Sequence, residues 1–110
     1  MNRVSLVGHL ADAPSYAAAV GERPARAAFS IGVPRRGSSA VDWIGVTAIA
    51  ARADAVAGAG LPAGAVVAVE SYLHLTSRAG DGRYQLEVVA THVQPLAPAR
   101  TPYRQEATTP

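Results

Sequence analysis

Residues 41–58 read VDWIGVTAIAARADAVAG and change character halfway along. In the first ten, Val41 to Ala50, the even positions from Ile44 onward are uniformly apolar, which predicts a strand with one fully buried face. The odd positions, among them Trp43, also include apolar residues. The remaining eight, Ala51 to Gly58, are rich in alanine and are followed by glycine and proline, which predicts a short helix. A strand that leads directly into a helix therefore lies near the middle of the chain.

Four other blocks of the chain alternate apolar and polar residues with the period of a half-buried strand. Short stretches of turn-forming residues, such as PRRGSSA at 34–40 and SRAGDG at 77–82, separate these blocks. The blocks run from Asn2 to Leu10, from Ala25 to Val33, from Gly64 to Thr76 and from Arg83 to Leu96. Phe29, in the second block, falls on the apolar side and is expected in the core. The pattern favours an all-β domain.

The order of the predicted elements is three strands, one helix and two strands. Five short strands commonly close into a barrel, because closure removes exposed sheet edges. A five-stranded OB-fold barrel normally carries its helix between strands three and four, where residues 51–58 fall. We therefore predict an OB-fold domain over residues 1–96. Residues 97–110 read APARTPYRQEATTP, lack apolar periodicity and are expected to form a disordered tail.

Composition limits the classes of protein to consider. At 110 residues the chain is long enough for one domain with a modest core. Without cysteine it has no disulfide and no thiolate metal site, and no apolar run approaches the roughly 20 residues of a membrane span, so we expect a cytoplasmic protein without membrane contact. All ten basic residues are arginines, which suit phosphate contacts, although arginine-rich codon usage explains them equally well. A net charge of +2 does not by itself indicate a nucleic-acid partner.

Four segments of the chain, in the same order and at nearly the same spacing, resemble the bacterial single-stranded DNA-binding protein family over residues 1–96. MNRVSLVGHLADAP at 1–14 is similar to the start of that family, AAFSIGVPRR at 27–36 to its second strand, VDWIGVTAIA at 41–50 to its third, and RYQLEVVATHVQPL at 83–96 to its closing strand. The resemblance implies an OB-fold barrel that binds single-stranded DNA without a cofactor, as a homo-oligomer, either a tetramer or a dimer.

The chain also departs from the family pattern. Ile49 stands where the family usually has an aromatic residue, the tryptophan expected near Arg78 is missing, and the loop at 34–40 is short and lacks an aromatic residue. The tail has no acidic, phenylalanine-terminated tip, so recruitment of partners through such a tip is not expected. Primosomal replication proteins, which are short relatives of the same fold without this tail, offer the alternative of a scaffold that binds proteins and only weakly DNA.

The candidate DNA-binding residues are of two kinds, aromatic side chains on which bases stack and arginines that contact phosphates. Trp43 is the first stacking candidate, because Ile44, Val46 and Ala48 already fill the opposite face of its strand. Core packing is the alternative for Trp43, and a half-buried position on a strand is the alternative for Tyr72. The arginine candidates are Arg35 and Arg36, in a loop without a neighbouring acid, Arg78 and Arg83, which flank one turn, and the weaker Arg3 and Arg26.

Nothing in the chain supports catalysis. No glycine-rich phosphate loop or nucleophile elbow occurs, and the histidines His9, His74 and His92 follow no zinc spacing. We therefore expect no catalytic residue, no metal, no cofactor and no small-molecule substrate. The sequence predicts a protein that binds and protects single-stranded DNA in replication, repair or recombination.

Overall fold

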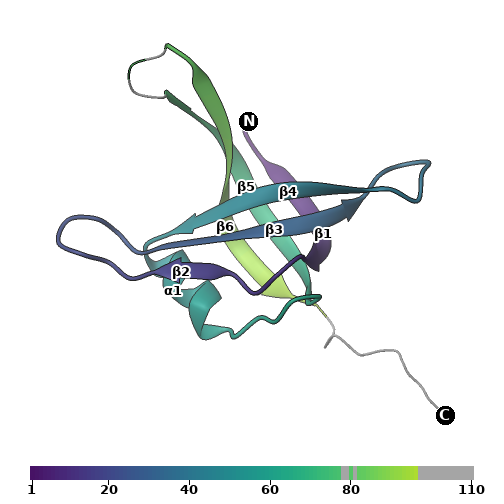
Figure 1. Ribbon diagram of the computed structural model, residues 1–110, viewed down its shortest axis with the longest axis horizontal. Coiled ribbons are helices and arrows are strands. Elements are labelled where there is room, and N and C mark those ends of the chain that lie inside the picture. The colour runs from purple at the N-terminus through teal and green to yellow at the C-terminus, as the bar shows by residue number, and fades with distance from the viewer. Residues whose placement is uncertain (78–79, 81, 97–110) are drawn as a thin grey trace.

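The computed structural model of the protein describes residues 1–77, 80 and 82–96. In chain order its elements are β1 (Val4–Leu10), β2 (Ser15–Ala17), β3 (Arg26–Pro34), β4 (Val41–Ile49), α1 (Ala51–Gly58), β5 (Val66–Ser77) and β6 (Tyr84–Pro95) (Figure 1). All five predicted strands and the helix are present, and β2 is a short additional strand. The tail predicted to be disordered, residues 97–110, and the candidate Arg78 lie outside the described residues.

The strands form a closed barrel. The sheet order is β1-β5-β6-β4-β3-β2, and a second pairing of β1 with β3 closes it. This pairing requires Gly8, because a Cβ atom there would lie 2.1 Å from the carbonyl oxygen of Gly32. All pairings are antiparallel except that of β4 with β6. The closed five-stranded barrel, with α1 between β4 and β5, confirms the predicted OB-fold.

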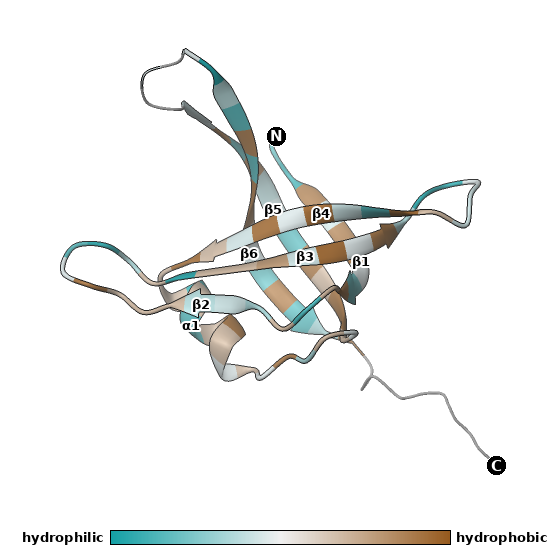
Figure 2. Ribbon diagram, viewed as in Figure 1, coloured by the Kyte–Doolittle hydropathy of each residue, from teal (hydrophilic) through white to brown (hydrophobic). Residues whose placement is uncertain are grey.

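The barrel interior holds the apolar residues that the alternation predicted. Phe29 and Ile31 of β3, Val46 of β4, and Val67 and Val69 of β5 are all buried. The helix α1 adds Ala53 and Val56 to the same core. Alternating hydropathy is visible along the ribbon of β4 (Figure 2). On β3, burial of one face leaves the alternate positions Arg26, Ala28 and Ser30 exposed.

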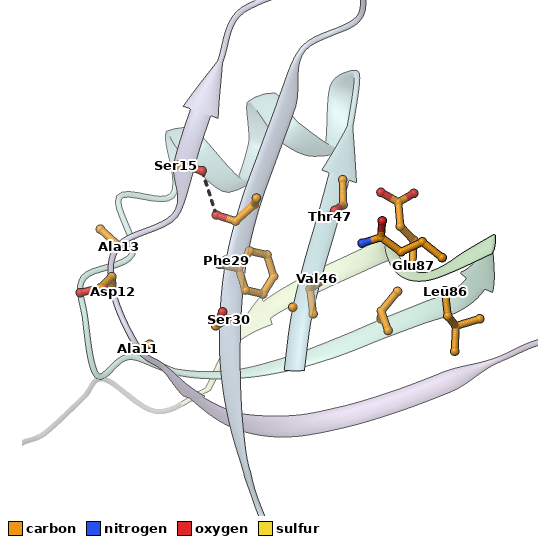
Figure 3. Close-up of a pocket in the computed structure, with 14 residues that line it drawn as sticks. Ala11, Asp12, Ala13, Ser15, Phe29, Ser30, Val46, Thr47, Leu86 and Glu87 are labelled. Carbon is orange, nitrogen blue, oxygen red and sulfur yellow. Dashed lines mark hydrogen bonds between the residues drawn. The ribbon is translucent and has the colours of Figure 1, made fainter. Parts of the chain in front are cut away.

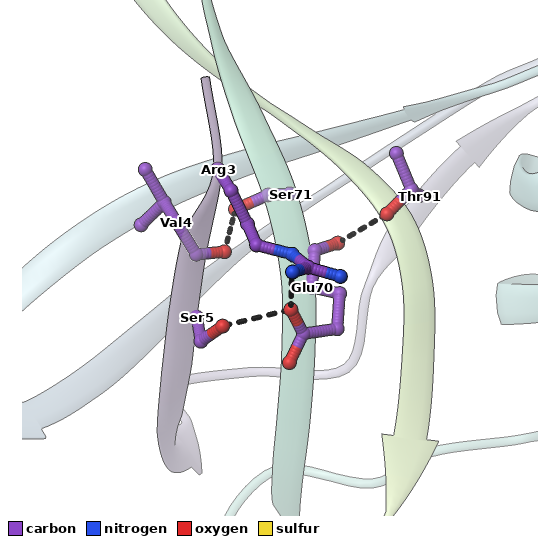
Figure 4. Close-up of polar contacts among 6 residues, drawn as sticks. All are labelled: Arg3, Val4, Ser5, Glu70, Ser71 and Thr91. Atoms are coloured by element: carbon purple, nitrogen blue, oxygen red, sulfur yellow. Dashed lines mark hydrogen bonds and ion pairs between the residues drawn. The ribbon is translucent and has the colours of Figure 1, made fainter. Parts of the chain in front are cut away.

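A β-bulge interrupts the pairing of β5 with β6. Glu70 pairs with His92 and the next residue, Ser71, pairs with Ala90, so Thr91 is an extra residue on β6. The Thr91 hydroxyl donates to the carbonyl oxygen of Glu70 at 3.1 Å, and the buried Ser71 hydroxyl donates to the carbonyl oxygen of Val4 at 2.8 Å (Figure 4). These bonds join β1, β5 and β6 where the bulge bends the sheet.

Beyond the barrel, β5 and β6 continue as a projecting hairpin (Figure 1). We call this part, residues 73–77 and 84–87, the arm. Leu75 pairs with Leu86 and Ser77 with Tyr84, and the arm exposes Leu73, Leu75, Tyr84 and Leu86. Leu73 and Leu75 alternate in step with the buried Val67 and Val69, but the arm extends past the core that would cover them.

No helix in the described ranges is long and apolar enough to cross a membrane.

Candidate nucleic-acid interface

The outer face of β3 and β4 carries the predicted stacking residue. Alternation along β4 turns its odd positions, Trp43 to Ile49, away from the core. Their register partners on β3, from Trp43 onward, are Gly32, Ser30, Ala28 and Arg26. Three of these four partners are small residues. The face is therefore shallow along its middle, with Trp43 near one end and Arg26 near the other.

Trp43 is 53% exposed and rests on the backbone of β3. A Cβ atom on Gly32 would lie 2.8 Å from Cζ3 of the indole, so the ring occupies the space that a side chain at position 32 would take. His9 of β1 contacts the indole edge to face, with ring centroids 5.2 Å apart and an interplanar angle of 80°. Our sequence reasoning missed His9 and Gly32, although a glycine inside a strand is a known sign of close approach.

The two arginines of the β3–β4 loop differ in their surroundings. Arg35 donates from Nη2 at 2.7 Å and from Nε at 3.1 Å to the same carboxylate oxygen of Asp42. The expectation that no acid lies near these arginines is therefore wrong for Arg35, because the hairpin register brings Asp42 back beside it. The hydrogen bond to Asp42 raises the pKa of Arg35 above its usual value. Arg36 is exposed and forms no ion pair with the residues that the structure describes.

Two further candidate arginines are also paired with acids. Arg26 of β3 donates to Glu87 of β6 at 2.9 Å, and because β4 lies between these two strands, the ion pair crosses β4. Arg3 lies 3.8 Å from Glu70, whose carboxylate also accepts from Ser5 at 2.7 Å (Figure 4). Arg3 therefore belongs to the β1–β5 side of the barrel and is not on the face of Trp43.

The remaining candidates lie toward the arm. Tyr72 of β5 is 36% exposed and is joined to the outer face of β4 through the pairs Tyr72↔Val89 and Val89↔Thr47. Tyr72 lies on the same face of the sheet as Trp43, but on β5, two strands away. It is level with Thr47, four residues beyond Trp43 on β4, so the two rings are not adjacent. Arg83 lies just before β6 and already interacts with other parts of the chain.

The outer face of β3 and β4 thus carries the predicted stacking residue Trp43 near one end and Arg26 near the other, and Arg35 and Arg36 lie in the loop that joins these two strands. The family model of the single-strand binding protein family matches residues 1–96, which include the whole barrel. No curated protein matches the chain. Proteins of the matched family bind single-stranded DNA and are not enzymes. On this match and on its closed barrel, the chain belongs to the single-strand binding protein family.

Proposed function

We propose that the protein coats single-stranded DNA without sequence specificity and protects it during replication, repair or recombination. One observation carries this proposal, the indole of Trp43 lying against Gly32 with half of its surface open. An aromatic ring held in this way offers a π face on which any base can stack, and such a contact contributes about 1–3 kcal/mol per base.

In this proposal, arginine side chains contact the phosphates of the bound DNA strand. Arg36 is exposed at the β3–β4 loop, close in the chain to the ion pair of Arg35 with Asp42. A phosphate that binds Arg35 competes with the carboxylate of Asp42, so Arg35 contributes less than an unpaired arginine does. Arg83 adds a positive charge at the arm, and Arg26, like Arg35, contributes less than an unpaired arginine because it is paired with Glu87.

We also propose that the barrel acts as a homo-oligomer, a dimer or a tetramer, in the cytoplasm. One exposed tryptophan per chain provides limited stacking, and linked copies raise the overall affinity because the second contact becomes intramolecular. The exposed leucines of the arm support association, since apolar surface of this kind often lies at interfaces.

The first test uses Trp43 as its own probe, because it is the only tryptophan. The protein is titrated with oligo-thymidine at low and at high salt, and indole fluorescence is recorded, with duplex DNA of the same length as the control. The proposal expects saturable quenching that weakens at high salt and is absent with duplex. Absence of both quenching and binding at low salt would contradict the proposal.

A second candidate function is a scaffold that binds other replication proteins and only weakly binds DNA. The arm favours it, because Leu75 and Leu86 are 60% and 58% exposed and lie opposite each other. Stoichiometry separates the two functions. A coating protein binds in proportion to DNA length, whereas a scaffold saturates at a fixed ratio and requires a protein partner.

A further inference from the structure

An open hollow of about 630 Å³ lies where β6 diverges from β4 (Figure 3). Only two pairs, Val46↔Val88 and Thr47↔Val89, join these strands. Toward the arm the strands separate, and Gln85 to Glu87 form one wall of the space. The loop at Ala11–Ala13 forms the opposite wall, and β3 and β4 lie between the two (Figure 3).

The hollow exists because the side chains along β3 and β4 are small. Ala28, Ser30 and Gly45 all line it, and a Cβ atom on Gly45 would meet nothing within 4 Å. Gly45 is two residues from Trp43 on the same face of β4, a separation of about 7 Å. A single strand that stacks one base on Trp43 therefore places a neighbouring base over the hollow.

The charge of the lining favours a base over a phosphate. Among the described residues that line the hollow, the charged ones are two acids, Asp12 and Glu87, which repel a phosphate group. Arg26 holds Oε2 of Glu87 at 2.9 Å, and the Glu87 side chain is only 22% exposed, so its position is well defined. Within the described residues, Oε1 of Glu87 accepts no hydrogen bond and remains an open acceptor.

We propose that this hollow receives one nucleobase and that Glu87 favours bases with an exocyclic amino group over thymine and uracil. The inference rests on the proposed function, since it requires a bound single strand. An ionised carboxylate only accepts hydrogen bonds. The amino groups of cytosine and adenine donate to it, whereas O4 of thymine is itself an acceptor and is repelled. Glu87 is thus a specificity-determining residue that adds a bias to otherwise sequence-tolerant binding.

The test compares two labelled oligonucleotides of equal length, one of thymidine and one of 5-methyl-2′-deoxycytidine. Their bases share the ring and the methyl group and differ at the amino or carbonyl edge. The quantity measured is the ratio of their dissociation constants, for the wild type and for Glu87→Gln. A glutamine amide both accepts and donates, so it serves either base. We expect the preference for methylcytidine to fall about fivefold in Glu87→Gln, the lower end of the discrimination expected for a well-placed base contact.

Using a ratio removes the side effects of the substitution. Glu87→Gln also releases Arg26 from its ion pair, which strengthens binding to both oligonucleotides alike. This common effect cancels in the ratio of the two dissociation constants. Glu70→Gln is the matched control, because Glu70 is also paired with an arginine but does not line the hollow. Its ratio should equal that of the wild type, and circular dichroism checks that both variants fold.

The possible outcomes separate this inference from the proposed function. A ratio that stays within twofold of the wild type in Glu87→Gln overturns the inference and leaves DNA coating intact. An equal fall in Glu70→Gln also overturns it, because the effect would then not come from the hollow. If the wild type binds neither oligonucleotide at low salt, the proposed function is overturned together with the inference.

Discussion

Trp43 lies open on the surface of a strand because its neighbour on β3, Gly32, has no side chain. The indole lies over that glycine, and His9 holds it from the side. A tryptophan positioned in this way loses little conformational freedom when a base stacks on it, because the ring is already held in place. The position of the indole therefore depends on three residues from three strands.

Removing the indole tests its contribution directly. We expect Trp43→Ala to weaken oligo-thymidine binding by about 1–3 kcal/mol, which is the contribution of one stacked base. Trp43→Phe should keep part of the affinity, because a smaller ring still offers a π face. Fluorescence anisotropy with labelled DNA measures both variants. Wild-type affinity in Trp43→Ala would show that the indole does not contact the strand.

The support that Gly32 gives to the indole can be tested without substituting Trp43 itself. A methyl group at this position would lie 2.8 Å from the ring, so Gly32→Ala must displace Trp43. We expect weaker DNA binding, by more than about twofold given the stacking energy, and a shifted tryptophan emission spectrum. Gly58→Ala, where a Cβ atom meets nothing within 4 Å, is the control and should change neither. Unchanged emission in Gly32→Ala would mean that the ring does not rest on β3.

At the scale of elements, two contacts between segments distant in sequence fix how the barrel is assembled. One is the close approach of β1 to β3 at Gly8, which closes the barrel. The other ties β2 to the helix, where the Tyr16 phenol donates to Oδ1 of Asp54 at 2.5 Å. This hydrogen bond raises the pKa of Tyr16 above its usual value.

Closure of the barrel predicts a large cost for a methyl group at position 8. The new Cβ would lie 2.1 Å from a backbone oxygen of Gly32, and backbone cannot move aside as a flexible side chain can. We expect Gly8→Ala to lower the free energy of unfolding by about 1–3 kcal/mol or more, since overpacking typically costs that much. Urea denaturation measures it. A midpoint equal to that of Gly58→Ala would argue against close contact between β1 and β3.

The bond from Tyr16 to Asp54 predicts a pH dependence at alkaline pH. Because the phenol pKa is raised in the folded state, the bond stabilises the fold fully below the unfolded value of about 10. That stability is lost as the pH rises through the folded pKa. The stability of the wild type should therefore fall more steeply above about pH 10 than that of Tyr16→Phe. Urea denaturation at pH 8 and at pH 11 measures the stability of both proteins. If the wild type and Tyr16→Phe lose the same stability between these pH values, the bond contributes nothing.

At the scale of the whole molecule, ion pairs neutralise much of the positive charge. The net charge is only +2, and Arg3, Arg26 and Arg35 are each paired with an acid. Because Arg26 and Arg35 are paired, the proposed DNA-binding surface offers few unpaired cations to phosphates, and we expect stacking to supply a large share of the affinity. We therefore expect DNA affinity to fall as salt rises, but less steeply than it would if all of these arginines were unpaired.

Arg36 provides the test of this view. Each phosphate neutralised on a single strand contributes about 0.7 to the slope of log affinity against log salt. We expect Arg36→Ala to reduce the magnitude of the slope by about that amount per protomer. Arg52→Ala, on helix α1, should leave the slope unchanged. Equal slopes in wild type and Arg36→Ala would remove Arg36 from the path of the strand.

The positions of the strands and of α1 followed from the sequence, because periodicity is local. Side chains alternate with period two along a strand but not along a helix. The buried residues of β3, among them Phe29 and Ile31, could therefore be predicted from the residues next to them in the sequence. The family was apparent from four short segments, because their order and spacing are retained. The exposure of Trp43 was predicted from the apolar residues on the other face of its strand together with the family resemblance, because the strand pattern alone also allowed core packing.

Only the tertiary structure decided which groups are available on the outer face of β3 and β4. Arg26 and Glu87 are 61 positions apart, and no local pattern indicates that the barrel brings them together across β4. The support of Trp43 by Gly32 and His9, and the hollow left where β6 diverges from β4, likewise depend on contacts between strands distant in the chain. Local sequence determines which face of a strand is apolar, whereas barrel closure determines which outward side chains meet.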